Sequence, residues 1–145
     1  MKTLVIAEHN GEQLSATTLS VVDAAKKLGR EIDLLVASNS SSNILEEAKA
    51  VEGVTTVLDF SHEKFKNEIA EDIAACVVSV KDSYDFFLAS SSTSGKNNLP
   101  RAAALMNIQQ ISEVTEILDD KTFKKRSICC PVGDVCRTLV RRRVR

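Results

Sequence analysis

Short apolar runs alternate with segments of helical periodicity along this chain, and no other feature limits its possible folds as strongly. Four runs read as largely apolar strands, the first of them apolar on both faces as a buried parallel strand is, while a fifth reads either as a strand or as an extended crossing segment. The four lie at residues 3–7, 32–37, 54–58 and 84–89, and the fifth at 108–116. The alternation predicts an α/β, doubly wound domain whose mostly parallel sheet is covered by helices on both faces.

Helix signals fill the intervals between these runs. Ser15 can cap a helix that continues to Leu28 and stops at Gly29, and a short helix is predicted over residues 44–51. The first helix has one apolar face, formed by Leu19, Val22, Ala25 and Leu28. This spacing places the four side chains against the sheet.

Two further helices are predicted in the second half of the chain. Ser61 can cap the first, whose apolar residues recur at helical spacing and form one buried stripe. These residues are Phe65, Ile69, Ile73, Cys76 and Val80. Cys76 has apolar neighbours and no adjacent base, so it is interpreted as a core residue rather than as a reactive thiol. The second helix includes Pro100, which suits a first turn because it has no N–H.

The loop from Ser90 to Gly95 joins a strand to this last helix. Such a joint directs free N–H groups and a partial positive charge at the crevice above the strand, where phosphate or carboxylate binds favourably. The phosphate-loop pattern G-x-x-x-x-G-K-[ST] keeps its last glycine and its lysine as Gly95 and Lys96, but its first glycine is replaced by Ser90 and its hydroxyl by Asn97. We interpret the segment as a structural turn, and the alternative is a stand-alone adenine-nucleotide-binding α/β domain.

The same stretch carries a family resemblance. Residues 95–105 read G-K-N-N-L-P-R-A-A-A-L and residues 110–114 read Q-I-S-E-V. These blocks resemble G-K-N-x-L-P-R-x-A-A and [AQ]-I-S-[DE] in the N-terminal half of the electron-transfer flavoprotein alpha subunit. Three further blocks are similar to that family in the same order, at residues 4–9, 24–29 and 48–58. The resemblance runs from about Lys2 to about Ile128, and several ordered blocks are far more specific than one motif.

The resemblance implies a three-layer Rossmann-like domain, similar to the adenine-nucleotide alpha-hydrolase-like folds. In the family, a second domain of the alpha subunit holds FAD, the partner beta subunit holds AMP, and the alpha N-terminal domain binds neither. The implied role is a scaffold that packs against the beta subunit, in a heterodimer that carries electrons from acyl-CoA and related dehydrogenases to a quinone reductase. We therefore expect this chain alone to be no enzyme and to bind no FAD. The implied location is the bacterial cytoplasm or the mitochondrial matrix.

Ligands of doubly wound domains bind at the carboxyl ends of the strands. For this reason His9, residues 38–42 and residues 90–96 should share one rim. His62, the only other histidine, follows the expected cap residue and should be exposed to solvent.

A nucleophile–base pair is the main catalytic alternative at this rim. It would require His9 beside Ser91 or Ser92, with Glu8 or Asp85 to orient the imidazole ring. We interpret His9 as an ordinary rim residue instead. We assign no catalytic, cofactor-binding or metal-binding residue.

The end of the chain differs from the rest in charge. Residues 1–120 carry 10 basic and 19 acidic side chains, a net charge of −9, whereas residues 121–145 carry nine basic and one acidic side chain, a net charge of +8. Residues 137–145 could bind nucleic acid or anionic lipid by charge alone, but no aromatic residues are interleaved with the arginines. Three cysteines also lie in this segment, in a spacing that does not fit a four-ligand metal site; they are Cys129, Cys130 and Cys136. We expect no nucleic-acid partner.

The resemblance to the family stops at residue 128. The family continues with an R-x-I-Y-A-G-N-A type strand and a second domain, whereas residues 129–136 read C-C-P-V-G-D-V-C here. We expect one domain over residues 1–128 and a divergent Cys/Arg-rich tail over residues 129–145 that packs poorly. Neither a membrane-inserted span nor a signal or transit peptide is expected.

Overall fold

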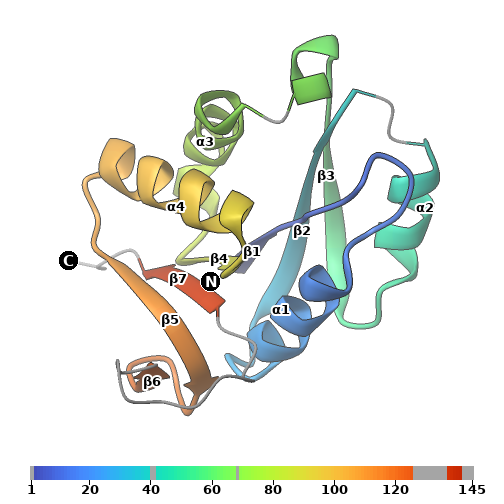
Figure 1. The fold of residues 1–145 in the computed structure, drawn as a ribbon. Helices are drawn as coiled ribbons and strands as arrows, with labels where there is room; N and C mark the ends of the chain where they lie inside the picture. Colours follow the sequence, from blue (N-terminus) through green and yellow to red (C-terminus); the bar gives the residue numbers. More distant parts are fainter. Residues whose placement is uncertain (1, 40–41, 68, 126–136, 142–145) are drawn as a thin grey trace.

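Four parallel strands form the centre of the sheet in the computed structural model, which describes residues 2–39, 42–67, 69–125 and 137–141. Their bounds are β1 Lys2–Ile6, β2 Glu31–Ser38, β3 Val54–Ser61 and β4 Phe86–Ser90. They lie in the order β3-β2-β1-β4 (Figure 1). Strands β2 and β3 follow one another on one side of β1, and β4 pairs with the other side of β1. The doubly wound α/β prediction is confirmed.

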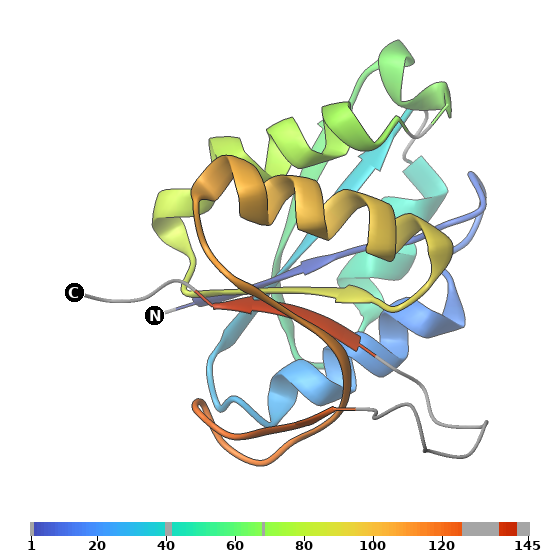
Figure 2. The same ribbon diagram turned by 60° about the vertical axis from the view of Figure 1, so that its left-hand side comes forward.

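Helices cover both faces of this sheet (Figure 2). One face is covered by α1 (Ala16–Lys26) and α2 (Ser42–Ala50), and the other by α3 (Ala70–Ser79) and α4 (Thr93–Met106). Two short 3-10 segments, η1 (Glu63–Asn67) and η2 (Lys81–Ser83), flank α3. The predicted first two helices are confirmed as α1 and α2, and the Ser15 hydroxyl caps α1 by accepting the N–H of Thr17 at 3.3 Å.

Each central strand contributes alternate side chains to two separate cores. In β1, Leu4 and Ile6 pack with residues of α3 and α4, whereas Val5 packs with residues of α1 and α2. All three side chains are buried. Because successive side chains of a strand point to opposite faces, a strand covered on both faces must be apolar throughout. This requirement explains the uninterrupted apolar runs and gives the three layers visible in Figure 2.

Three more strands extend the sheet beyond β4. They are β5 (Gln110–Ile117), β6 (Phe123–Lys125) and β7 (Arg137–Arg141), and the complete order is β3-β2-β1-β4-β7-β5-β6. Because β7 is antiparallel to both β4 and β5, the strand β5 runs in the same direction as β4. The ambiguous run at 108–116 is therefore a strand.

Residues 137–141 of the expected tail form the strand β7. It pairs with β4 over five residues, from Ser90↔Arg137 to Phe86↔Arg141. A β-branched and apolar centre, Thr138-Leu139-Val140, suits a strand, and the backbone groups of β4 and β5 on either side require partners. The three tail cysteines lie outside the described residues. The boundary at residue 128 stays a prediction.

The helix predicted to start at Ser61 is wrong at its beginning. Ser61 is the last residue of β3 and pairs with Ser38 of β2, and α3 begins only at Ala70. Pairing along the whole of β3 outweighs one capping signal. Ile69 precedes α3 and is consequently 45% exposed. Leu19, expected on the apolar face of α1, is also exposed, at 44%. The rest of the stripe does lie in the core or against it: Phe65, Ile73, Cys76 and Val80.

Helix α4 begins earlier than the sequence indicates. The Ser92 hydroxyl caps it by accepting the N–H of Gly95 at 3.0 Å, so Thr93 is its first residue. Pro100 therefore lies in the helix interior rather than in the first turn. It has no N–H to donate to the carbonyl of Lys96. Lys96 is exposed, so water can replace the missing donor.

One buried carboxylate interrupts the apolar pattern of β2. Asp33 is 2% exposed, and its Oδ2 accepts hydrogen bonds from the Tyr84 hydroxyl at 2.8 Å and from the Lys2 ammonium at 3.2 Å. These donors offset part of the cost of burying the carboxylate, whose other oxygen, Oδ1, has no hydrogen-bond partner among the described residues. Burial raises the pKa of the Tyr84 phenol, and the hydrogen bond to Asp33 raises this pKa further.

The raised pKa of Tyr84 predicts that the folded chain loses stability at alkaline pH. Above pH 10, the ordinary value for tyrosine, the unfolded chain releases the phenolic proton and the folded chain keeps it, so the free energy of unfolding falls by up to about 1.4 kcal/mol per pH unit. Tyr84 is the only tyrosine, so tyrosinate absorbance reports its titration directly. The midpoint should lie higher in the folded chain than in urea; equal midpoints would contradict the expectation.

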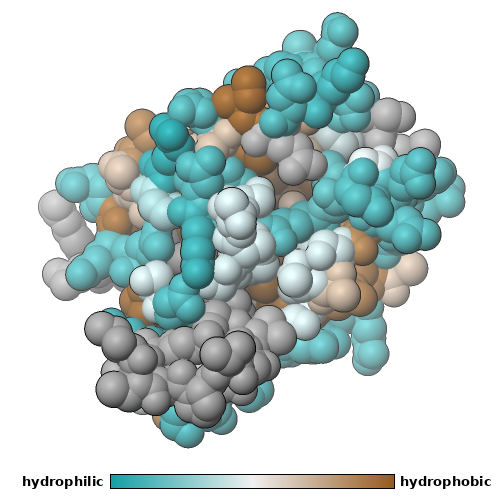
Figure 3. All heavy atoms as spheres, viewed as in Figure 1, coloured by the Kyte–Doolittle hydropathy of each residue, from teal (hydrophilic) through white to brown (hydrophobic). Residues whose placement is uncertain are grey.

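The exposed apolar residues are scattered over the surface. On the face shown in Figure 3, polar residues predominate and separate the apolar patches. Among the residues that the structure describes, the large exposed apolar side chains come from four different places in the fold: Leu19, Ile69, Leu105 and Leu118. Among the described residues, no helix is both long enough and apolar enough to cross a membrane.

Candidate functional site

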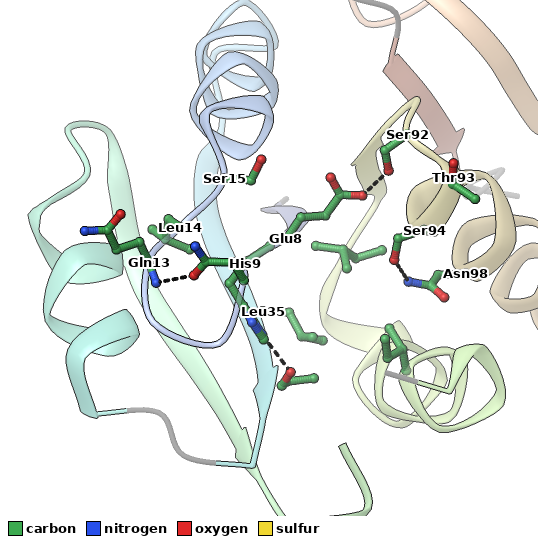
Figure 4. A pocket seen from close by; sticks show the side chains of 15 residues that line it. Glu8, His9, Gln13, Leu14, Ser15, Leu35, Ser92, Thr93, Ser94 and Asn98 are labelled. Atoms are coloured by element: carbon green, nitrogen blue, oxygen red, sulfur yellow. Dashed lines mark hydrogen bonds between the residues drawn. The ribbon is translucent and has the colours of Figure 1, made fainter. Parts of the chain in front are cut away.

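The loops that follow β1 and β4 enclose a cavity of about 440 Å³ at the point where the strand order reverses. Glu8 and His9 come from the first loop, and Ser92, Ser94 and Asn98 come from the cap and first turns of α4 (Figure 4). Because β1 and β4 are parallel neighbours, their carboxyl ends meet at one edge of the sheet. The cavity therefore lies where a doubly wound domain usually binds its ligand.

Glu8 makes hydrogen bonds to helices on both faces of the sheet. Its Oε1 accepts from the Ser92 hydroxyl and from the Gly95 N–H, the latter at 3.2 Å. Its Oε2 accepts from the Thr17 hydroxyl at 3.0 Å. Ser92 and Gly95 belong to the start of α4, and Thr17 belongs to the first turn of α1. One carboxylate thus joins the N-termini of two helices.

His9 is held toward β2. Its Nδ1 accepts the N–H of Gly11 at 3.3 Å, and its Nε2 lies 2.9 Å from the carbonyl oxygen of Ala37. Since Nδ1 acts as an acceptor, the proton is on Nε2, which donates to Ala37. The shared rim is confirmed for His9 and for residues 92–94, which line the cavity together. Of the expected segment 38–42, residues 38 and 39 do not line the cavity, and residues 40–41 lie outside the described residues.

The nucleophile–base alternative finds no support in the serine contacts. The Ser91 hydroxyl donates to Glu113 at 3.1 Å, and the Ser92 hydroxyl donates to Glu8. Each hydroxyl has one proton, so neither serine donates to His9. An activated serine would need that hydrogen bond.

Asp85 lies at the wrong end of the sheet to orient His9. It precedes β4, and its carboxylate accepts the N–H of Lys2, at the start of β1, at 3.1 Å. The orienting role considered for Asp85 is therefore wrong, because a residue before a parallel strand lies at the edge opposite to residues after it. His62 is exposed, as predicted.

The residues of the incomplete phosphate loop serve other purposes. The Lys96 ammonium lies 2.6 Å from the carboxylate of Glu113, and Asn97 is exposed. Gly95 is needed for a close approach, since a Cβ atom built there would lie 2.0 Å from the carbonyl oxygen of Ser90. The glycine of the pattern is thus a packing residue, which agrees with the interpretation of a structural turn.

Sequence reasoning missed one buried polar residue of the cavity. Asn98 is 3% exposed, and its Nδ2 donates to the Ser94 hydroxyl at 3.0 Å. Its spacing from Ser94 is one helical turn, a signal that is visible only once α4 is known to begin at Thr93.

Cys76 is a core residue, as predicted. It is 7% exposed, and burial raises the pKa of its thiol. Within the described ranges, no three His, Cys, Asp or Glu side chains gather as metal ligands would.

The fold and the cavity together define a doubly wound α/β domain in which the edge that usually binds ligand is closed by the chain's own carboxylate. A family model described as electron transfer flavoprotein domain matches residues 3–128. The chain belongs to this family.

Curated relatives support the same assignment. The chain is 42% identical over 125 residues to electron transfer flavoprotein subunit alpha of Pseudomonas aeruginosa, covering 86% of this chain and 40% of the relative. It is 38% identical over 130 residues to the mitochondrial subunit alpha of Dictyostelium discoideum, covering 84% and 37%, and 39% identical over 132 residues to that of Arabidopsis thaliana, covering 85% and 36%. The chain thus spans about 40% of the length of these relatives. The resemblance read from the sequence blocks is confirmed.

Proposed function

We propose that this chain is the N-terminal scaffold and interaction domain of an electron-transfer flavoprotein alpha subunit. One observation carries the proposal: the similarity fills 84–86% of this chain and only 36–40% of the three relatives compared above. The matched part is a domain with two cores, and the relatives extend well beyond it. We assign the redox chemistry to that additional length, and we propose that the residues matched here serve an electron carrier as its docking domain rather than as an enzyme.

The proposed partner is the beta subunit of the same flavoprotein. In the complete heterodimer, electrons would pass from acyl-CoA and related dehydrogenases to a quinone reductase. FAD would be held by the alpha-subunit length that this chain does not include, and AMP by the beta subunit. The relatives come from bacteria and mitochondria, so the proposed location is the bacterial cytoplasm or the mitochondrial matrix.

The cavity does not fit a flavin or an adenine nucleotide. Two donors at the N-terminus of α4, the Ser92 hydroxyl and the Gly95 N–H, already bind the Glu8 carboxylate. The described residues that line it include no Phe, Tyr or Trp side chain on which a ring could stack. These features support the proposal over the stand-alone nucleotide-binding alternative.

Calorimetric titration of a purified beta subunit with this chain tests the proposal. Saturable binding with a one-to-one stoichiometry is expected, because the proposed role is docking. AMP titrated into the chain by itself serves as the comparison and should give no heat of binding. Absence of binding to the beta subunit, together with saturable micromolar binding of AMP, would favour the stand-alone nucleotide-binding domain instead.

A further inference from the structure

A position suited to a phosphate group exists above the end of β4, and an anion already occupies it. Helix α4 is 14 residues long, and its N-terminus opens onto the cavity. Its cap hydroxyl, from Ser92, and its Gly95 N–H converge on a single oxygen, Oε1 of Glu8. A hydroxyl and a backbone N–H at a helix N-terminus are the donors that bind phosphate in many proteins. The occupant here is a carboxylate from the neighbouring loop.

A second helix satisfies the other oxygen of the same carboxylate. The Thr17 hydroxyl, from the first turn of α1, donates to Oε2 at 3.0 Å. In Figure 4 the Glu8 side chain extends across the cavity toward Ser92. Both oxygens of Glu8 therefore have donors, and the two donor groups come from helices on opposite faces of the sheet.

The backbone of Glu8 is also fixed in place. Its N–H donates to the Thr18 hydroxyl at 2.9 Å, and its carbonyl accepts from the same hydroxyl at 3.1 Å. Thr18 is only 1% exposed. These bonds fix the point of the backbone from which the Glu8 side chain reaches the two helices. The Glu8 carboxylate is therefore positioned to bind the donors of α1 and α4 from within the protein.

We propose that Glu8 is an internal anion that keeps phosphate groups out of the cavity at the end of β4. A phosphate group would compete for the same donors and would be repelled by the carboxylate beside them. Removal of the Glu8 carboxylate leaves these donors directed into a cavity of about 440 Å³, which is large enough for a phosphate ion. The inference goes beyond the scaffold role and would hold whether or not the beta subunit binds.

The test uses inorganic phosphate as the probe and full-length variants of the chain. Glu8→Ala should bind phosphate at least tenfold more tightly than the unmodified chain, measured by calorimetry against sodium chloride of equal ionic strength. Its thermal unfolding midpoint should rise with phosphate concentration. Glu12→Ala is the matched control, because it removes the same charge from an exposed position in the same loop and should behave as the unmodified chain does.

Two further variants place the effect at this cavity. Adding Ser92→Ala to Glu8→Ala removes the cap hydroxyl and should lower the gained phosphate affinity several-fold. Glu8→Gln removes the charge and keeps the shape, so it should fold even if Glu8→Ala does not, and it should bind phosphate more tightly than the unmodified chain. Equal phosphate affinity in the unmodified chain and in whichever folded Glu8 variant is obtained would overturn the proposal.

Discussion

Gly95→Ala is expected to abolish the folded state of this chain. A Cβ atom at residue 95 would lie 2.0 Å from the carbonyl oxygen of Ser90 and 3.0 Å from its carbonyl carbon, and both atoms belong to the backbone. No side-chain rotation can relieve the contact, so α4 must move away from the end of β4. That movement would also break the Gly95 hydrogen bonds to Ser92 and Glu8. We expect a loss of about 4 kcal/mol or more, which approaches the whole stability of a domain at the low end of the usual range.

Gly29→Ala provides the matched control for this variant. Gly29 ends the turn after α1 with a φ of +62°, and a Cβ atom built there has no heavy atom within 4 Å. The substitution therefore costs only the left-handed backbone strain, about 1 to 2 kcal/mol. Urea unfolding followed by far-ultraviolet circular dichroism compares the two variants. If Gly95→Ala proved no less stable than Gly29→Ala, the close contact between α4 and β4 would be wrong.

Deletion of residues 137–145 is expected to cause the second large effect. The deletion removes β7, and with it five backbone pairs to β4 and the pairs to β5. All five residues of β4 are buried, so its backbone groups would lose their partners inside the protein. Two unpaired strand edges in the middle of a sheet also favour association with other chains. The shortened chain should be unfolded or aggregated in size-exclusion chromatography.

Deletion of residues 142–145 alone is the appropriate control, because it removes three of the tail arginines and keeps β7. This shorter deletion should elute as the full chain does. The comparison also tests the predicted domain boundary at residue 128. A monomeric, fully stable chain of residues 1–136 would support that boundary and contradict a structural role for β7.

Most of the fold is readable from local patterns. Buried parallel strands must be apolar throughout and crossover helices must have one apolar face, and both patterns are plain from Thr3 to Leu105. The predictions of secondary structure are wrong where pairing with a segment far away along the chain determines the local structure. Ser61 reads as a helix cap and instead extends β3, because Ser38 pairs with it. The position of β7 depends on the open edges of β4 and β5, which no local pattern reveals.

The site was only partly predictable for the same reason. The sequence places His9 and Ser92 on one rim, because both follow parallel strands. It does not indicate that the Glu8 carboxylate would be bound by Ser92 and Gly95, which are 84 and 87 residues away along the chain. That contact also depends on Ser92 being the cap of α4, and the sequence reading began the helix nearer Pro100.

The central claim is that this chain is a docking scaffold and that the flavin is held elsewhere. Sedimentation velocity tests both parts when the chain is mixed with FAD alone and with FAD and the beta subunit, and absorbance is recorded for protein and for flavin. We predict that the chain sediments with the beta subunit and that no flavin sediments with the chain alone. Flavin that sediments stoichiometrically with this chain in the absence of the beta subunit would contradict the account.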